Sequence, residues 1–157
     1  MNENPAISQA LRSFLNQAEV AWFRVYDSGF GRKRIYTRGN EYSQLPLRYS
    51  TKAKIYSYFR KYWGVSFSKT LMCSMQPLVY NGRVYVVVGD PGPVAFVVKS
   101  ARVVSSTCCR LRVRAVLSGD PDGNVVVYYT LARTANGSYR IIGRTRLKYD
   151  YRFTCMR

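Results

Sequence analysis

Apolar residues near the start of the chain recur at intervals of three and four positions, a period typical of an amphipathic α-helix. This pattern predicts a helix over residues 6–26. Pro5 stands at its first turn and Gly29 lies beyond its end, as expected at helix boundaries. The apolar stripe consists of Ile7, Leu11, Phe14, Leu15, Ala18, Trp22 and Val25.

Two shorter segments with the same period follow a polar stretch. Residues 27–46 are rich in glycine and polar side chains, and they predict a basic loop with one short strand at 34–38. Residues 49–64 and 66–76 then predict two short helices, the second of which ends before a proline.

From Leu78 onward the period changes to two, which places alternate side chains on opposite faces of a strand. Asn81-Gly82 is a residue pair favoured in two-residue hairpin turns. Three helices followed by an antiparallel meander predict an α+β fold, in which the N-terminal helices pack on one face of a curved sheet. The strands predicted after this hairpin span residues 95–104, 109–118, 124–134 and 139–153.

We expect one domain over residues 1–157, because the chain shows no linker and no internal repeat. A hydrophobic fraction of 47% and an aromatic fraction of 15% argue against a disordered chain. No apolar run has the length of a membrane span, and we expect no signal peptide in the chain as written, which leaves a cytosolic protein or one whose leader was removed. The expected parts are a helical region and basic loop at 1–48, two short helices at 49–77 and the antiparallel sheet at 78–157.

The chain is strongly basic, with a formal charge of +17 from 25 basic and 8 acidic side chains. Such an excess attracts anionic partners without identifying them. The 18 arginines outnumber the 7 lysines, which suits two-pronged contacts with phosphate or carboxylate groups. A well-solvated basic surface is the other interpretation of the same composition.

Basic residues at every second position form two rows in the predicted sheet, and we expect both rows on one face. These anion-contact candidates are Arg110, Arg112 and Arg114, and then Arg144, Arg146 and Lys148. A sheet face of arginine and tyrosine binds single-stranded nucleic acid through backbone charge and base stacking. A solvated strand face whose charges prevent edge pairing explains the same rows.

The chain contains no histidine, which excludes catalysis and metal binding that depend on this residue. The carboxylates form no arrangement with a nucleophile or a metal-ligand set, so we expect no enzyme activity, no metal and no cofactor. Glu19 is expected on the exposed side of the first helix, and Asp150 is expected to pair with a nearby arginine.

The four cysteines lack the CxxC spacing of a zinc ribbon or a thioredoxin-like site. Their even number permits disulfides, and a set of small reduced core residues is equally consistent with the sequence. The adjacent Cys108 and Cys109 are expected to face opposite sides of a strand, so that at most one is buried. The other two are Cys73 and Cys155.

The segments TKAKIYSYFRKYW, NGRVYVVVGDPG and YDYRF occur in this order between Arg48 and Phe153. This part of the chain resembles the bacterial DL-endopeptidase inhibitor family, most specifically at Thr51–Lys54 and Asn81–Asp90. The resemblance implies a cystatin-like, NTF2-like fold in a secreted, non-enzymatic protein. It also implies binding to the catalytic domain of an NlpC/P60-type peptidoglycan hydrolase, whose cysteine active site is blocked so that cell-wall cleavage is restrained.

Two Gly-Asp-Pro turns are the candidate contacts with such a partner, because rigid turns at the tip of a sheet present a preordered surface to a cleft. Simple strand connection is the alternative role of each turn. Three functions therefore remain open: a cell-wall hydrolase inhibitor, a cytoplasmic nucleic-acid-binding protein, and a small-molecule-binding or vestigial NTF2-like domain. Anionic cell-wall polymer is a further possible partner of the basic surface. The turn residues are Asp90, Pro91 and Gly92, and Asp120, Pro121 and Asp122.

Overall fold

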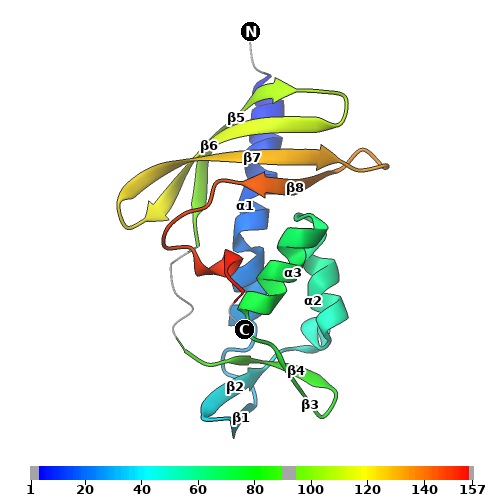
Figure 1. Cartoon of the computed structure of the whole chain (residues 1–157), viewed down its shortest axis with the longest axis vertical. Coiled ribbons are helices and arrows are strands. Elements are labelled where there is room, and N and C mark those ends of the chain that lie inside the picture. Colours follow the sequence, from blue (N-terminus) through cyan, green and yellow to red (C-terminus); the bar gives the residue numbers. More distant parts are fainter. Residues whose placement is uncertain (1–3, 90–94, 156–157) are drawn as a thin grey trace.

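The computed structural model describes residues 4–89 and 95–155. The long helix α1 runs along the molecule, with one four-stranded sheet across its N-terminal half and a second sheet beyond its C-terminal end (Figure 1). Three helices packed with curved antiparallel sheet confirm the predicted α+β fold. The helices are α1 (Pro5–Asp27), α2 (Lys52–Phe59) and α3 (Val65–Ser74), and the short 3₁₀ helices are η1 (Leu47–Tyr49) and η2 (Tyr151–Phe153). The strands are β1 (Arg34–Thr37), β2 (Asn40–Gln44), β3 (Leu78–Tyr80), β4 (Arg83–Val87), β5 (Val97–Ser106), β6 (Arg110–Asp120), β7 (Gly123–Arg133) and β8 (Tyr139–Arg144).

Helix α1 follows its predicted pattern closely. The Asn4 side chain accepts a hydrogen bond from the Ala6 amide at 3.0 Å, and Pro5 occupies the first helical position. Most of the predicted apolar stripe is buried. Ile7, in the first turn of the helix, lies outside the core and is 56% exposed. The helix therefore forms the centre of the core, through Leu11, Leu15, Ala18, Ala21, Trp22, Phe23 and Val25.

The two short helices also form where they were predicted, although α2 is shorter than expected. Thr51 caps α2 by accepting a hydrogen bond from the Lys54 amide at 3.1 Å. After Phe59 the chain leaves the helix and reaches Gly64, whose amide donates to the Ile141 carbonyl on β8 at 2.8 Å. Glycine suits this contact, because a Cβ at position 64 would lie 3.2 Å from that carbonyl oxygen.

The first sheet has the strand order β1-β2-β4-β3, with all pairs antiparallel. Asn81 and Gly82 have positive φ angles of 48° and 72°, which confirms the predicted hairpin. The sequence interpretation missed β2, which pairs with β1 through a turn at Arg38-Gly39 with φ angles of 53° and 77°. The β3–β4 hairpin consequently pairs with β2 and does not belong to the meander of later strands.

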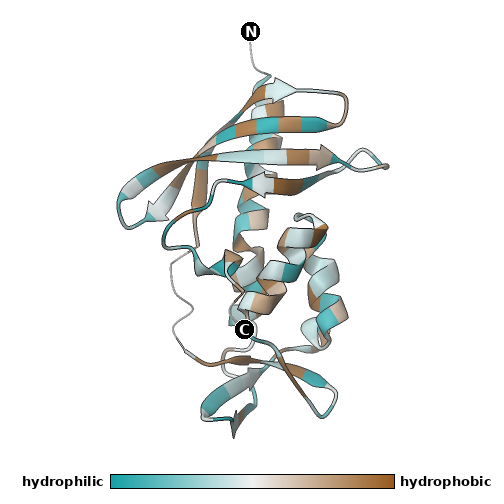
Figure 2. Ribbon diagram, in the orientation of Figure 1, coloured by the Kyte–Doolittle hydropathy of each residue, from teal (hydrophilic) through white to brown (hydrophobic). Residues whose placement is uncertain are grey.

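The second sheet is the meander β5-β6-β7-β8. Its first three strands lie within a few residues of their predicted positions. Hydrophobic and hydrophilic bands alternate along β6 (Figure 2). The apolar side chains of Val113, Ala115 and Leu117 are buried in the same core as those of α1. The space between helix and sheet is filled by buried side chains such as Leu15, Ala18, Val113 and Leu131. This filled interface counts against a deep ligand cavity at that position.

The last predicted strand is wrong in length, because β8 ends at Arg144 and not at Phe153. Beyond Arg144 the chain turns back toward α1 and forms η2. Alternating residue types continue past Arg144, but the Arg144 and Arg152 side chains form ion pairs with Glu19 and Asp150 in the interior. The strand therefore ends at a residue of this buried cluster.

Candidate functional site

Three arginines form a row on the outer face of β6. Arg110, Arg112 and Arg114 alternate with side chains that face α1, as the sequence predicts. The Arg112 guanidinium donates to Thr130 Oγ1 at 3.1 Å, and it lies 5.3 Å from the centre of the Tyr128 ring. These two contacts hold Arg112 over the neighbouring strand β7 while it stays exposed.

The row continues into a basic hollow at the edge of the sheet. Arg114 lies opposite Arg102 in the β5–β6 pair, and both line a hollow of about 500 Å³ beside the first turns of α1. Arg12 and Lys99 complete its charged lining, which contains no acidic side chain. The sequence interpretation did not identify these three additional residues, although Arg102 alternates with apolar neighbours as the β6 arginines do. We define the basic face as Arg12, Lys99, Arg102, Arg110, Arg112 and Arg114.

The described acidic side chains lie away from the basic face. Glu19 and Asp150 are buried inside the molecule, Asp27 is the last residue of α1, and Glu41 forms an exposed ion pair on the first sheet. Asp120 and Asp122 lie at the β6–β7 turn, and Arg110 lies at the other end of β6. Like charges gathered without acidic neighbours create a positive potential that attracts and orients anionic partners. The geometry therefore favours binding of an anionic surface to the basic face.

The second predicted row does not share this face. The Arg144 side chain is only 1% exposed and forms an ion pair with Glu19 at 2.8 Å. Arg146 and Lys148 are exposed, but they follow the end of β8 and line a different hollow near Cys73. The expectation that both rows lie on one face of the sheet is therefore wrong, because Arg144 is buried and the segment after it is not a strand.

A buried cluster of two acids and two arginines joins α1 to the C-terminal segment. Arg152 donates to Glu19 Oε2 at 2.7 Å, and to both Asp150 oxygens at 2.9 and 2.7 Å. Arg144 contacts the same two carboxylates, and the Tyr129 hydroxyl donates to Glu19 Oε1 at 2.6 Å. The predicted pairing of Asp150 with an arginine is confirmed, whereas the expected exposure of Glu19 is wrong. The rings of Phe23, Phe96 and Phe153 pack against the two guanidinium groups.

The electrostatics of this cluster suit a structural role. Burial raises the pKa of Glu19. The charges of Arg144 and Arg152, with hydrogen bonds from Arg144 and Tyr129, together lower it by more, so that the pKa is about 2. Burial and the Glu19 charge raise the pKa of the Tyr129 hydroxyl well above its usual value. Glu19 is therefore ionised and Tyr129 protonated at neutral pH, and both are closed off from solvent. The ion pairs and hydrogen bonds of this cluster hold the C-terminal segment against α1.

The candidate turns fall in two different parts of the chain. Asp120 Oδ1 accepts a hydrogen bond from the Asp122 amide at 2.9 Å, so this aspartate stabilises its own turn. Pro121 and Asp122 are exposed at the tip of the β6–β7 hairpin. The other candidates, Asp90, Pro91 and Gly92, lie outside the described residues.

An apolar groove of about 650 Å³ lies along the opposite side of the N-terminal half of α1. Sequence reasoning did not find it, because its lining comes from α1, the segment after α2, and strands β6 to β8. Phe14 and Tyr62 meet in it with ring centres 5.9 Å apart. The lining comprises Ile7, Ala10, Leu11, Phe14, Lys61, Tyr62, Leu111, Leu131, Ser138, Tyr139 and Arg140.

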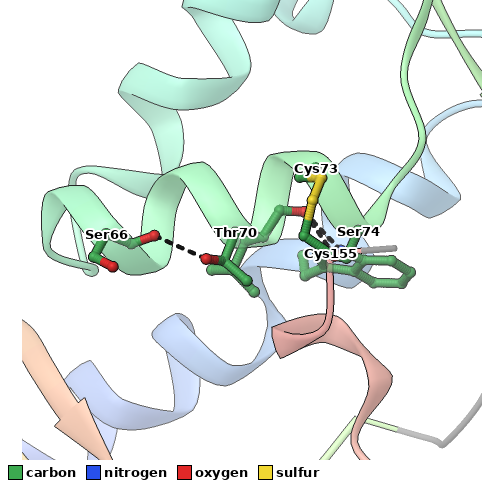
Figure 3. The surroundings of a disulfide bond; sticks show 7 residues. Ser66, Thr70, Cys73, Ser74 and Cys155 are labelled. Atoms are coloured by element: carbon green, nitrogen blue, oxygen red, sulfur yellow. Dashed lines mark hydrogen bonds between the residues drawn. A yellow bond between two sulfur atoms is a disulfide. The ribbon is translucent and has the colours of Figure 1, made fainter. Parts of the chain in front are cut away.

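The cysteines differ in their environment. Cys73 on α3 forms a disulfide with Cys155, and the Cα atoms lie 5.4 Å apart (Figure 3). Cys108 and Cys109 are both free and exposed. They lie in the turn before β6 and not within a strand, so the prediction that they face opposite sides is wrong. Their sulfur atoms are 2.9 Å apart.

Across residues 4–89 and 95–155, histidine, cysteine and acidic side chains form no group of three that could hold a metal ion. None of the helices in this part of the chain is both long enough and apolar enough to cross a membrane.

Comparison with known proteins shows the family of the chain. No curated protein matches it. The family of the IseA DL-endopeptidase inhibitor matches residues 5–120, which extend from α1 to the end of β6 and include every residue of the basic face. The chain therefore belongs to the IseA DL-endopeptidase inhibitor family.

Proposed function

We propose that this protein restrains cell-wall hydrolysis by binding and inhibiting a peptidoglycan DL-endopeptidase of the NlpC/P60 type. The family match over residues 5–120 is the observation that carries this proposal. The protein acts without catalysis, as a partner that covers the cysteine active site of the hydrolase. Its place of action is outside the cytoplasm, which the Cys73–Cys155 disulfide supports because such bonds persist in oxidising compartments.

The basic face is the surface that we assign to the hydrolase. Arg102 and Arg114 are neighbours across two strands, and Arg112 is held over β7 by Thr130 and Tyr128. Side chains that are already positioned lose less conformational entropy when they bind. Arginine also forms two-pronged hydrogen bonds with carboxylates, which lysine does not. The complementary surface on the hydrolase is therefore acidic and lies beside its catalytic cleft.

Hydrolysis of purified peptidoglycan by an NlpC/P60 DL-endopeptidase tests this function. The rate is measured with and without an excess of this protein, at low and high salt, and a basic protein of similar net charge serves as the control. We expect inhibition by this protein alone, weaker at high salt but still present. Equal inhibition by the control protein, or no inhibition at either salt concentration, would contradict the proposal.

A second function is favoured by one contact on the basic face. The Arg112–Tyr128 pair places a cation and an aromatic ring together, as in surfaces that bind single-stranded nucleic acid. If the three β6 arginines each neutralise a phosphate, oligonucleotide affinity falls with salt with a logarithmic slope of about −2. Fluorescence anisotropy with labelled single-stranded DNA at several salt concentrations measures this slope. Absence of binding at low salt would exclude this function.

A further inference from the structure

The turn between β5 and β6 carries two adjacent thiols that have no other cysteine partner within the chain. The sulfur atoms of Cys108 and Cys109 lie 2.9 Å apart and both residues are exposed. The two remaining cysteines of the sequence are joined to each other as Cys73–Cys155. Within one molecule, Cys108 and Cys109 can therefore form a disulfide only with each other.

Arg110 and Arg133 place positive charge beside this pair. The hydrogen bond with Cys108 raises the pKa of Cys109, and the charges of Arg110 and Arg133 offset only part of this rise. Either sulfur can be the donor of this hydrogen bond, so either thiol can be the first to react. Exposed cysteines in an electropositive environment are the ones that exchange with disulfides.

The backbone around the pair is already ordered. Thr107 Oγ1 accepts hydrogen bonds from the amides of Cys109 at 3.4 Å and Arg110 at 3.2 Å. The Cys109 carbonyl accepts a hydrogen bond from the Arg133 amide on β7 at 2.8 Å. The turn is held from both sides, and the two sulfur atoms lie 2.9 Å apart, compared with about 2.05 Å in a disulfide.

We propose that Cys108 and Cys109 form a redox-active vicinal pair, which closes to an intramolecular disulfide by exchange with a low-molecular-mass disulfide. This modification site is independent of the proposed inhibitory function. It changes the turn at the start of the β6 arginine row and leaves the paired strands in place.

The exchange proceeds in two balanced steps. One thiolate of the pair, for example that of Cys108, attacks one sulfur of the small disulfide, whose S–S bond breaks, and one small thiolate leaves and takes up a proton. Cys109 then loses its proton and attacks the Cys108 sulfur, so that the mixed disulfide breaks and the second small thiolate leaves. The cysteine pair loses two electrons and two protons, and the small disulfide gains them as two thiols.

Peptide mapping after treatment with glutathione disulfide tests the proposal. Trypsin cleavage after Arg102 and Arg110 releases residues 103–110, which contain both thiols and no other cysteine. We expect this peptide from the intact protein to lose the mass of two hydrogen atoms and to resist alkylation until a reductant is added. Cys109→Ser should stop at the first step, with one glutathione retained on Cys108.

Three outcomes would overturn the proposal. These are a peptide that stays fully open to alkylation, a peptide that carries two glutathione groups, and a peptide cross-linked to a second chain.

Binding of phenylarsine oxide gives an independent measurement, since trivalent arsenic bridges two close thiols. We expect one arsenical per wild-type chain, and its complete loss in both Cys108→Ser and Cys109→Ser. Retention of tight arsenical binding by either single variant would also contradict a vicinal pair.

Discussion

At the residue scale, Glu19 shows how strongly one buried side chain is constrained by its partners. Its two carboxylate oxygens accept hydrogen bonds from Tyr129, Arg144 and Arg152, and all of these side chains are buried. A buried charge is tolerated when it is paired and hydrogen-bonded, and removal of one partner leaves the others uncompensated. The stability of the fold therefore depends on Glu19 far more than on any exposed acidic residue.

Glu19→Gln should lower the free energy of unfolding by about 3–5 kcal/mol, because it leaves the Arg144 and Arg152 charges without a full counter-charge. Glu41→Gln is the matched control, since Glu41 pairs with Arg34 at 3.3 Å on the exposed first sheet. That control should change the free energy by less than about 1 kcal/mol. Urea unfolding of the three proteins makes the comparison, and equal stability of the two variants would contradict the role of the cluster.

The same residue predicts a specific pH dependence. Its pKa falls from 4.5 to about 2 on folding, so the folded state binds the proton less well than the unfolded chain. The stabilisation from this carboxylate is fully present above pH 4.5 and is lost as the pH falls toward 2. At 1.36 kcal/mol per pKa unit, the loss in the free energy of unfolding is about 3 kcal/mol. Melting temperatures between pH 7 and pH 2 should fall more steeply for the wild type than for Glu19→Gln. Parallel curves would show that Glu19 is not the titrating group.

At the element scale, the segment after β8 is held to the rest of the molecule twice. The buried cluster anchors Arg152 to α1, and the Cys73–Cys155 disulfide anchors the chain end to α3 (Figure 3). A disulfide that closes a long loop destabilises the unfolded chain by restricting its conformations. The bond joins residues 82 positions apart, so its contribution to stability should be large.

Replacement of Cys73 and Cys155 by serine should lower the free energy of unfolding by about 2–4 kcal/mol. The double replacement of Cys108 and Cys109 by serine is the matched control, and its stability should be close to that of the wild type because both side chains are exposed. Thermal unfolding followed by circular dichroism separates the two cases. A similar loss in both double variants, or in neither, would contradict this account.

The elements that could be predicted are those whose signals are local. The helical stripe of α1, the Thr51 cap of α2 and the Asn81-Gly82 turn each depend on neighbouring residues, and each formed as expected. The end of β8 could not be predicted, because Arg144 turns inward to reach Glu19, 125 positions earlier in the sequence. Residue alternation also does not reveal which strands pair, so the separation into two sheets was missed.

In the candidate site, too, the features that depend on neighbouring residues could be predicted and those that depend on tertiary contacts could not. Period-two spacing identified Arg110, Arg112 and Arg114 correctly as a row on one strand face. Arg12 joins them only because α1 packs beside β5, and this neighbourhood depends on tertiary structure. The contact between the Cys108 and Cys109 sulfur atoms was also missed, because it needs a turn at a position where the sequence suggested the start of a strand.

At the scale of the whole molecule, the formal charge of +17 is distributed unevenly. Arg144 and Arg152 are neutralised by buried carboxylates inside the protein. The basic face carries six cations along β5, β6 and α1, and the residues that line its hollow include no acidic side chain. The long-range attraction that follows speeds the encounter with an acidic partner, and the positions of individual arginines decide whether the complex persists. A charge reversal on the basic face should therefore weaken inhibition more than the same change in net charge elsewhere on the surface.

The most direct test compares two variants in the peptidoglycan hydrolysis assay. Arg112→Glu combined with Arg114→Glu reverses charge on the basic face, and Lys69→Glu combined with Lys52→Glu makes the same change in net charge at exposed positions on α3 and α2. Circular dichroism first establishes that both variants are folded. We predict that the arginine variant inhibits the DL-endopeptidase at least about tenfold more weakly, a loss of about 1.4 kcal/mol in binding, while the lysine variant stays near the wild type. Equal inhibition by the two variants would contradict the assignment of the basic face as the inhibitory surface.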